Sequence, residues 1–189
     1  ANFPEFLPNT YDQYYLYPDY KVSHLDPNFT RADEVMAGRE KRVFTECAEV
    51  IKEGKLGDKF HAISDAHAEM MIKVAEAIAY NKNDRHILIV ENNGAIANMQ
   101  DDAMVEVVCE LGINGPRPMR VGNIPQFNLG LLVNQVSCEK LIVDAYFENS
   151  YQKALEAFTL NRLINDAKKA RKVLDALIEA NKGMWPELR

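Results

Sequence analysis

The sequence predicts an α+β domain that is mostly helical and carries a small sheet. Several segments repeat their apolar residues at helical spacing, which is typical of amphipathic helices. Two short segments, residues 86–90 and 104–108, have the β-branched or alternating pattern of strands and flank a polar turn at 92–94. A chain of 189 residues with 47% hydrophobic content can bury a core, so we expect one domain over residues 1–189.

Charge and cysteine usage limit the classes of partner. The net charge of −6 gives no basic face, so we expect no nucleic-acid partner. Apolar stretches are too short and too interrupted by charges to cross a bilayer, and the first residues lack the pattern of a signal peptide. Cys47, Cys109 and Cys138 are scattered and lack metal-binding spacing. We interpret them as reduced core thiols of a cytoplasmic protein.

The N-terminal segment is unusually aromatic. Residues 1–20 contain Pro4, Pro8, Pro18 and five tyrosines. So much apolar surface has to be covered. The segment therefore either folds over this domain or packs on another one.

A long helix is predicted from Thr30 to Lys52. Thr30 can cap it, with Asp33 three residues later, and apolar residues follow at helical spacing. Arg39 and Glu40 fall on the predicted inner face. Charges there indicate an ion pair, a functional site or an exposed end of the apolar stripe.

The middle of the chain is predicted to hold a second helix and the sheet. The helix begins at Ser64 or Asp65, ends at 81–84 and turns Met70, Met71 and Ile78 inward. Residues 86–90 read as a buried strand and 104–108 as a half-buried one. A short third strand is expected near 119–121, within a segment punctuated by proline and glycine.

Three helices are predicted to close the chain. The first, Gln126–Glu148, is apolar on more than one side, so we expect neighbours to wrap around it. The others span Tyr151–Leu160 and residues 166–181. No phosphate-binding loop, nucleophile elbow or zinc spacing is present in the sequence, and its four histidines are spread out. Composition and spacing alone therefore indicate only a mostly helical α+β domain.

Several motifs, in order along the whole chain, allow a further step. They are LPNTYDQYYLYPD at 7–19, TRADEVMAGRE at 30–40, LIVENNGAIANMQDDAMVEV at 88–107, VGNIPQF at 121–127, SYQKALEAF at 150–158 and EANKGMWPEL at 179–188. Together they resemble the C-terminal part of glycoside hydrolase family 4, and most closely its 6-phospho-α-glucosidase branch. The resemblance implies a fold like the C-terminal domain of lactate and malate dehydrogenases. It also implies that an N-terminal Rossmann domain for NAD, with the metal-binding Cys and His, is absent from this chain.

The same resemblance implies a mechanism for the intact enzyme. NAD takes a hydride from C3 of a phosphorylated sugar, which acidifies the proton at C2. A base removes that proton, the leaving group departs by elimination, water adds and the hydride returns. A divalent metal, commonly Mn²⁺, polarises the C2 and C3 oxygens. This route differs from the usual pair of carboxylates at a glycosidic bond.

The resemblance assigns two residues of this chain. Tyr11, in LPNTY, corresponds to the catalytic base, and Arg31, in TRA, to a substrate-binding arginine. A phenol normally titrates near 10, so a base at neutral pH needs a nearby cation. Asp12 stands where relatives carry an aliphatic residue, and its carboxylate would disfavour a phenolate. NAD and the metal are expected to bind mainly through the N-terminal part, so we assign no residue of this chain to either.

Alternatives remain open at this point. The turn at 92–94 is expected to be structural, although it could approach the site. The enzyme could act on another sugar, as a 6-phospho-β-glucosidase or an α-galactosidase, or the chain could be a non-catalytic assembly module. For the glycosidase, the partners expected are a phosphorylated disaccharide and further copies of the chain, in a homodimer or homotetramer to which Gln126–Glu148 contributes.

Overall fold

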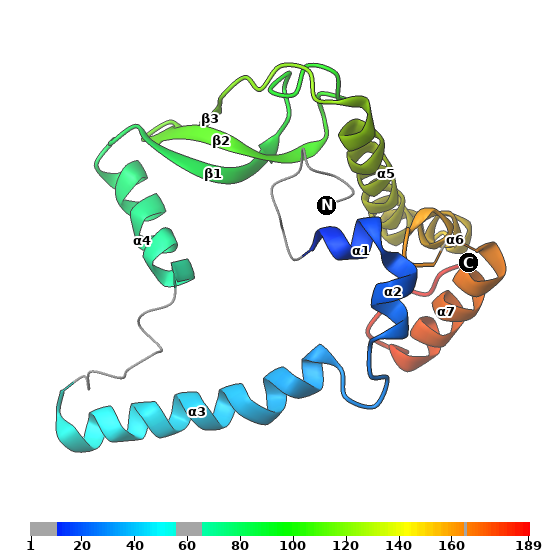
Figure 1. Ribbon diagram of the computed structural model, residues 1–189, viewed down its shortest axis with the longest axis horizontal. Helices are drawn as coiled ribbons and strands as arrows, with labels where there is room; N and C mark the ends of the chain where they lie inside the picture. Colours follow the sequence, from blue (N-terminus) through cyan, green and yellow to red (C-terminus); the bar gives the residue numbers. More distant parts are fainter. Residues whose placement is uncertain (1–10, 56–65, 165) are drawn as a thin grey trace. The chain divides into compact units, whose positions relative to one another are not determined.

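A computed structural model describes residues 11–55, 66–164 and 166–189, apart from the side chain of Asp12. The chain divides into two compact units, and we describe each by itself. Figure 1 labels the helices and strands of both. The first unit holds residues 11–24, 91–104 and 120–189, and the second holds residues 25–90 and 105–119. None of the described helices is both long and apolar enough to span a membrane.

Five helices make up most of the first unit. They are α1 (Asp12–Leu16), α2 (Pro18–Ser23), α5 (Gln126–Glu148), α6 (Tyr151–Leu160) and α7 (Ala167–Ala180). Helix α6 packs on both α5 and α7, around a core of Ala145, Ala154 and Leu174. The predicted bounds of α5 and α6 are confirmed, and α7 differs from the prediction only in that Asp166 and Asn181 are its caps.

The expectation that neighbours wrap α5 is met only in the middle of the helix, within the described chain. Only Val136, Cys138 and Ala145 of this helix are buried, whereas Val143 and Phe147 are exposed. Val136 and Cys138 lie about 200° apart around the helix axis, so neighbours cover the middle of α5 from opposite sides. The sequence pattern therefore indicated the apolar surface correctly and its coverage only in part.

The segment between the first two strands, residues 91–104, is organised by one buried amide. Asn92 is fully buried, and its Nδ2 donates to the carbonyl oxygens of Ile96, Met99 and Gln100 at 3.0–3.1 Å. Its Oδ1 accepts a hydrogen bond from the Ile96 N–H at 2.7 Å. A buried polar side chain is costly unless it is satisfied in this way. The prediction that this turn is structural is confirmed.

The described part of the N-terminal aromatic segment, residues 11–20, belongs to this first unit, although Tyr11, Tyr17 and Tyr20 are exposed. It forms α1 and α2, and α1 lies near the middle of α5 and the turn after α6, with which it lines a common pocket. Arg162, just after α6, donates a hydrogen bond to the backbone carbonyl of Tyr15 in α1.

The second unit contains α3 (Arg31–Glu53), α4 (Ala66–Ala79) and the strands β1 (Asp84–Glu91), β2 (Met104–Gly112) and β3 (Gly115–Pro118). The strand order is β1-β2-β3, and β2 pairs with β3 in antiparallel fashion from Cys109↔Pro118 to Gly112↔Gly115. Alternate residues of β2 are buried, which confirms a half-buried strand; they are Val105, Val107, Cys109 and Leu111.

Two predictions about the sheet need correction. Strand β1 lies where it was predicted but is not buried, because Ile87 and Ile89 face outward and are 58% and 68% exposed. The third strand is Gly115–Pro118 rather than residues 119–121. Pro116 and Pro118 suggested a loop, but β3 is at the edge of the sheet, where proline is tolerated because an edge N–H can remain unpaired.

Helix α3 begins as predicted. The Thr30 hydroxyl accepts from the Asp33 N–H and the Asp33 carboxylate accepts from the Thr30 N–H, which completes a capping box. None of the residues of α3 is buried. Arg39 and Glu40 are both exposed, which agrees with the expectation of an exposed end of the apolar stripe.

The same exposure corrects one prediction about cysteine. Cys47 on α3 is exposed, whereas Cys109 and Cys138 are buried as expected. Burial raises the pKa of both the Cys109 and Cys138 thiols, so these two stay protonated and apolar in character.

Helix α4 is present, but its predicted start at Ser64 or Asp65 lies outside the described residues. Met70, Met71 and Ile78 are exposed, contrary to prediction, and Ala77 is the buried residue of this helix.

The residues after α4 meet the turn between β2 and β3. The Asn81 Oδ1 accepts a hydrogen bond from the Ile113 N–H at 3.0 Å. A Cβ added to Gly112 would lie 2.7 Å from that oxygen and 2.8 Å from the Oδ1 of Asn83. Gly112 is therefore needed for this close approach.

Candidate functional site

Tyr11 lines a pocket of about 290 Å³ within the first unit. The pocket lies between α1, the middle of α5 and the turn after α6. Its lining combines phenol rings with amide and guanidinium groups and comes from Tyr11, Tyr14, Tyr15, Gln135, Asn161, Arg162 and Leu163. Such groups can stack on a ring and hydrogen-bond to hydroxyl or anionic oxygens.

Tyr11 itself occupies the N-cap position of α1. Its carbonyl accepts from the Tyr14 N–H at 3.0 Å, and its ring stacks on that of Tyr14 with centroids 6.4 Å apart. The side chain is 69% exposed. The phenol is therefore reachable from outside, as a group that takes a proton from a bound molecule has to be.

Two cations accompany the tyrosines. The Lys21 Nζ lies 4.9 Å from the centroid of the Tyr14 ring, in cation–π geometry. Arg162 lines the pocket, and its Nε donates to the Tyr15 carbonyl at 2.8 Å. A pocket with positive charge and polar donors suits a polar, negatively charged ligand.

Arg162 is the pocket residue that sequence reasoning missed. It is separated from Tyr15 by 147 positions, and neither periodicity nor a motif connects the two residues. Its only local signal is that it follows Asn161, the C-cap of α6, where a cation is favourable to the helix dipole.

Arg31 belongs to the second unit and Tyr11 to the first, so each is placed within its own unit. Arg31 is the first residue of α3 and is exposed. A cation there opposes the helix dipole, and the Glu34 carboxylate, 2.5 Å from its Nη1, compensates for it. The unfavourable position of the Arg31 cation at the helix start is thus compensated by an ion pair within α3.

No group of three or more His, Cys, Asp or Glu side chains within the described ranges could hold a metal ion. Asp12, whose carboxylate was expected to affect Tyr11, has its side chain outside the described part of the chain. The described residues therefore supply the pocket, its phenol and its cations.

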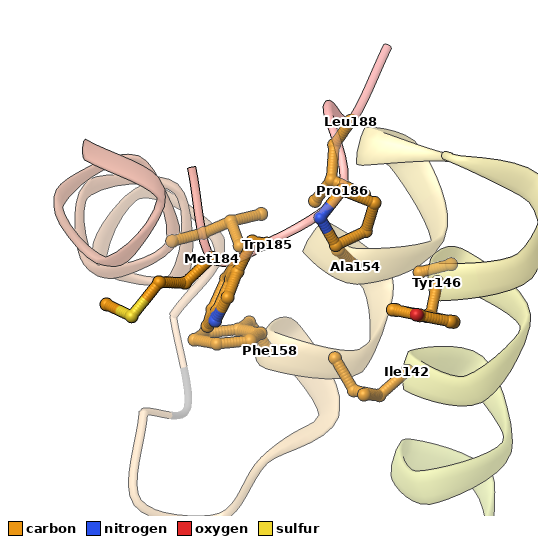
Figure 2. A pocket seen from close by; sticks show the side chains of 10 residues that line it. Ile142, Tyr146, Ala154, Phe158, Met184, Trp185, Pro186 and Leu188 are labelled. Carbon is orange, nitrogen blue, oxygen red and sulfur yellow. The ribbon is translucent and has the colours of Figure 1, made fainter. Parts of the chain in front are cut away.

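A second cavity, of about 310 Å³, has a different character. It lies between α5, α6, α7 and the C-terminal segment, and is lined by apolar side chains. Figure 2 shows Trp185 and Phe158 close together on one side, across from Ile142 and Tyr146 of α5. The cavity lacks charged side chains in its lining, so a proton-transfer site is better supported at Tyr11.

Comparison with known proteins agrees on one family. The profile of the family 4 glycosyl hydrolase C-terminal domain matches residues 1–164. The maltose-6'-phosphate glucosidase MalH of Clostridium acetobutylicum is 52% identical over 186 residues, which are 98% of this chain and 42% of that protein. The chain thus spans less than half the length of this curated relative.

Two solved structures extend the likeness. A crystal structure of a 6-phospho-α-glucosidase from gut microorganisms, in complex with NAD and Mn²⁺, is 81% identical, with a TM-score of 0.92. Another 6-phospho-α-glucosidase from gut microorganisms, in complex with NAD and glucose-6-phosphate, is 48% identical, with a TM-score of 0.89. Each alignment covers all of this chain and 43% of the other. The chain therefore belongs to the family 4 glycosyl hydrolases, of which it provides the C-terminal domain.

Proposed function

We propose that this chain is the C-terminal catalytic and oligomerisation part of an NAD- and metal-dependent 6-phospho-α-glucosidase. The observation that carries the proposal is the reachable phenol of Tyr11 in a polar, positively charged pocket. Identity of about half or more with proteins named for this activity supports the substrate class. An α-glucoside 6-phosphate supplies both the hydroxyl groups and the negative charge that the pocket suits.

In this proposal Tyr11 removes the proton from C2 of the sugar. NAD and Mn²⁺, bound mainly by an N-terminal part, would supply the oxidation of C3, the return of the hydride to C3 after water has added, and polarisation of the sugar oxygens. The phenolic oxygen of Tyr11 takes the C2 proton, the glycosidic bond breaks by elimination, and the proton is returned when water adds. An exposed phenol allows that proton to exchange with solvent between the two transfers.

The test joins the chain to an N-terminal NAD-binding part from a relative and follows hydrolysis of a chromogenic α-glucoside 6-phosphate with NAD and Mn²⁺. We expect turnover by the joined protein, none by the chain alone, and a loss of about 100-fold or more for Tyr11→Phe. In D₂O the glucose 6-phosphate released should carry deuterium at C2.

Tyr14→Phe is the matched control, because Tyr14 lines the same pocket one helical turn away. It should keep most of the activity. Turnover by the chain alone, or an unaffected Tyr11→Phe protein, would show that the base lies elsewhere.

Arg31 is proposed to bind the substrate. Arg31→Met should raise KM more than it lowers kcat, since the contact would be made in both ground and transition states. Glu34→Gln removes the ion-pair partner of Arg31 and serves as the control. Equal effects of the two variants would assign Arg31 to helix stability instead.

Four further properties complete the proposal, which concern the domain, its fold, the location of the enzyme and its oligomeric state. Residues 1–189 act as one C-terminal domain, similar to that of lactate and malate dehydrogenases, and the enzyme works in the cytoplasm. It forms a homodimer or homotetramer, for which the exposed apolar residues of α5 provide surface. Phe147→Asp should then lower the mass found by analytical ultracentrifugation, whereas an unchanged mass would exclude that face of α5 from the contact.

A further inference from the structure

The helix that carries Tyr11 is too short to hold its own shape. Helix α1 has five residues, and its N-cap makes no side-chain hydrogen bond to the helix. Isolated helices shorter than about 12 residues are marginal in water, because nucleation costs more entropy than one turn recovers. The position of Tyr11 therefore depends on contacts from outside α1.

Arg162 makes such a contact. Its Nε donates to the Tyr15 carbonyl at 2.8 Å, and Tyr15 lies near the C-terminal end of α1. Carbonyl oxygens there lack a partner within the helix, and a cation is favourable to the helix dipole at this end. One hydrogen bond thus ties α1 to a residue 147 positions away.

The turn that carries Arg162 is itself held by several hydrogen bonds. Asn161 caps α6 through its N–H to the Ala157 carbonyl, and its side-chain oxygen accepts from the Leu163 N–H at 3.0 Å. The Ile164 N–H closes the turn onto the Asn161 carbonyl, also at 3.0 Å. Helix α6 in turn packs on α5 and α7 around Leu174.

We propose that Arg162 is a positioning residue, which holds α1 against the helical core and so fixes Tyr11 at the pocket. The inference rests on the proposed function only in so far as Tyr11 is the base. The core holds α6, and α6 holds the turn at 161–164 that carries Arg162. Arg162 in turn holds Tyr15, which lies one helical turn after Tyr11. A base that moves by about 1 Å can lose a factor of about 100 in rate.

The experiment compares three variants in the joined enzyme. Arg162→Met removes the donor but keeps much of the length, and Arg162→Lys restores a cationic donor. Arg171→Met is the matched control, because Arg171 belongs to the same unit and lies over the Tyr151 ring, away from the pocket.

Two readouts are taken from each variant. Hydrogen–deuterium exchange over residues 11–17 reports whether α1 is held, and it needs no activity. We expect faster exchange there in Arg162→Met, slower exchange again in Arg162→Lys, and no change in Arg171→Met. Steady-state kinetics should show kcat reduced about 10- to 100-fold in Arg162→Met with KM changed less, and a partial recovery in Arg162→Lys.

Each other outcome contradicts a defined statement. Unchanged exchange over 11–17 in Arg162→Met would overturn the inference, whatever the enzyme hydrolyses. Faster exchange with an unchanged kcat would also overturn it, because Tyr11 would then not depend on the tether. An unmodified enzyme that fails to hydrolyse α-glucoside 6-phosphates would instead contradict the proposed function, and the exchange data would still decide whether Arg162 holds α1.

Discussion

The two long helices, α3 and α5, have the same length of 23 residues and both end at a left-handed residue, but they differ in their start and in their burial. Helix α3 has a capping box at Thr30, yet none of its residues is buried. Helix α5 follows Pro125 with no side-chain cap, and buries three residues. Local backbone signals thus define α3, whereas packing against α6 contributes to α5.

The difference shows what each kind of evidence in a sequence is worth. Capping residues indicate where a helix starts and stops, because they satisfy its unpaired backbone groups locally, without a neighbouring element. An apolar stripe states only that a face is available for burial. On α3 that stripe includes Phe44 and Ile51, which are 67% and 83% exposed.

The largest expected effect concerns the packing around α5. Leu174→Ala should lower the free energy of unfolding by about 3 kcal/mol, because Leu174 is fully buried against Ala145 and Ala154. Leu177→Ala, on the same helix but 37% exposed, is the control and should cost clearly less. Chemical denaturation followed by circular dichroism measures both, and equal losses would contradict a packing-defined α5.

A second pair of variants compares the two helices directly. Val136→Ala in α5 should lower the free energy of unfolding by about 2 kcal/mol, since Val136 is only 7% exposed. Ile51→Ala in α3 should change it by less than about 0.5 kcal/mol. Thermal melts of the two proteins give the comparison. A large loss for Ile51→Ala would show that α3 is buried in solution.

The cap of α3 should matter locally. In a peptide of residues 26–55, Thr30→Ala should reduce helix stability by about 1 kcal/mol, because the Asp33 N–H loses its acceptor. Thr45→Ala is the control, since alanine is a better helix former within a helix. Circular dichroism of the three peptides should show a loss of helix for Thr30→Ala alone.

The smallest expected effect is the pH dependence of that cap. The hydrogen bonds from the Thr30 side chain and backbone lower the pKa of Asp33 from its usual 3.8. A lowered pKa in the folded state means that the ionised form stabilises the helix. The contribution is therefore fully present above about pH 4 and is lost as the pH falls through the lowered pKa. An NMR titration of the Asp33 carboxyl carbon should show the lowered pKa, and Thr30→Ala should return it toward its usual value.

The sequence predicted element positions better than burial. Helices α5 and α6 begin and end where the sequence pattern indicated, whereas Met71 and Ile89 are exposed against expectation. Periodicity identifies a face but carries no information about what covers it. Strand β3 was misplaced because Pro116 and Pro118 were interpreted as loop residues, although an edge strand accommodates them.

The site was predictable in part. Tyr11 and Arg31 came from motifs of the resemblance, and their roles remain predictions. The pocket around Tyr11 could not be foreseen, because Gln135 of α5 and Arg162 of the turn after α6 reach it from segments far along the chain. For Asn92 the sequence predicted a turn but not the burial of its side chain. The hydrogen-bond partners of an amide depend on the final path of the backbone.

The close approach of Gly112 to Asn81 has an evolutionary consequence. Any side chain at position 112 would push aside an oxygen that the Ile113 N–H needs, and would crowd Asn83 as well. A side chain at position 112 is therefore expected only where positions 81 and 83 have changed as well. Among related sequences, positions 81, 83 and 112 should vary as a set, although the first two follow a helix and the third ends a strand.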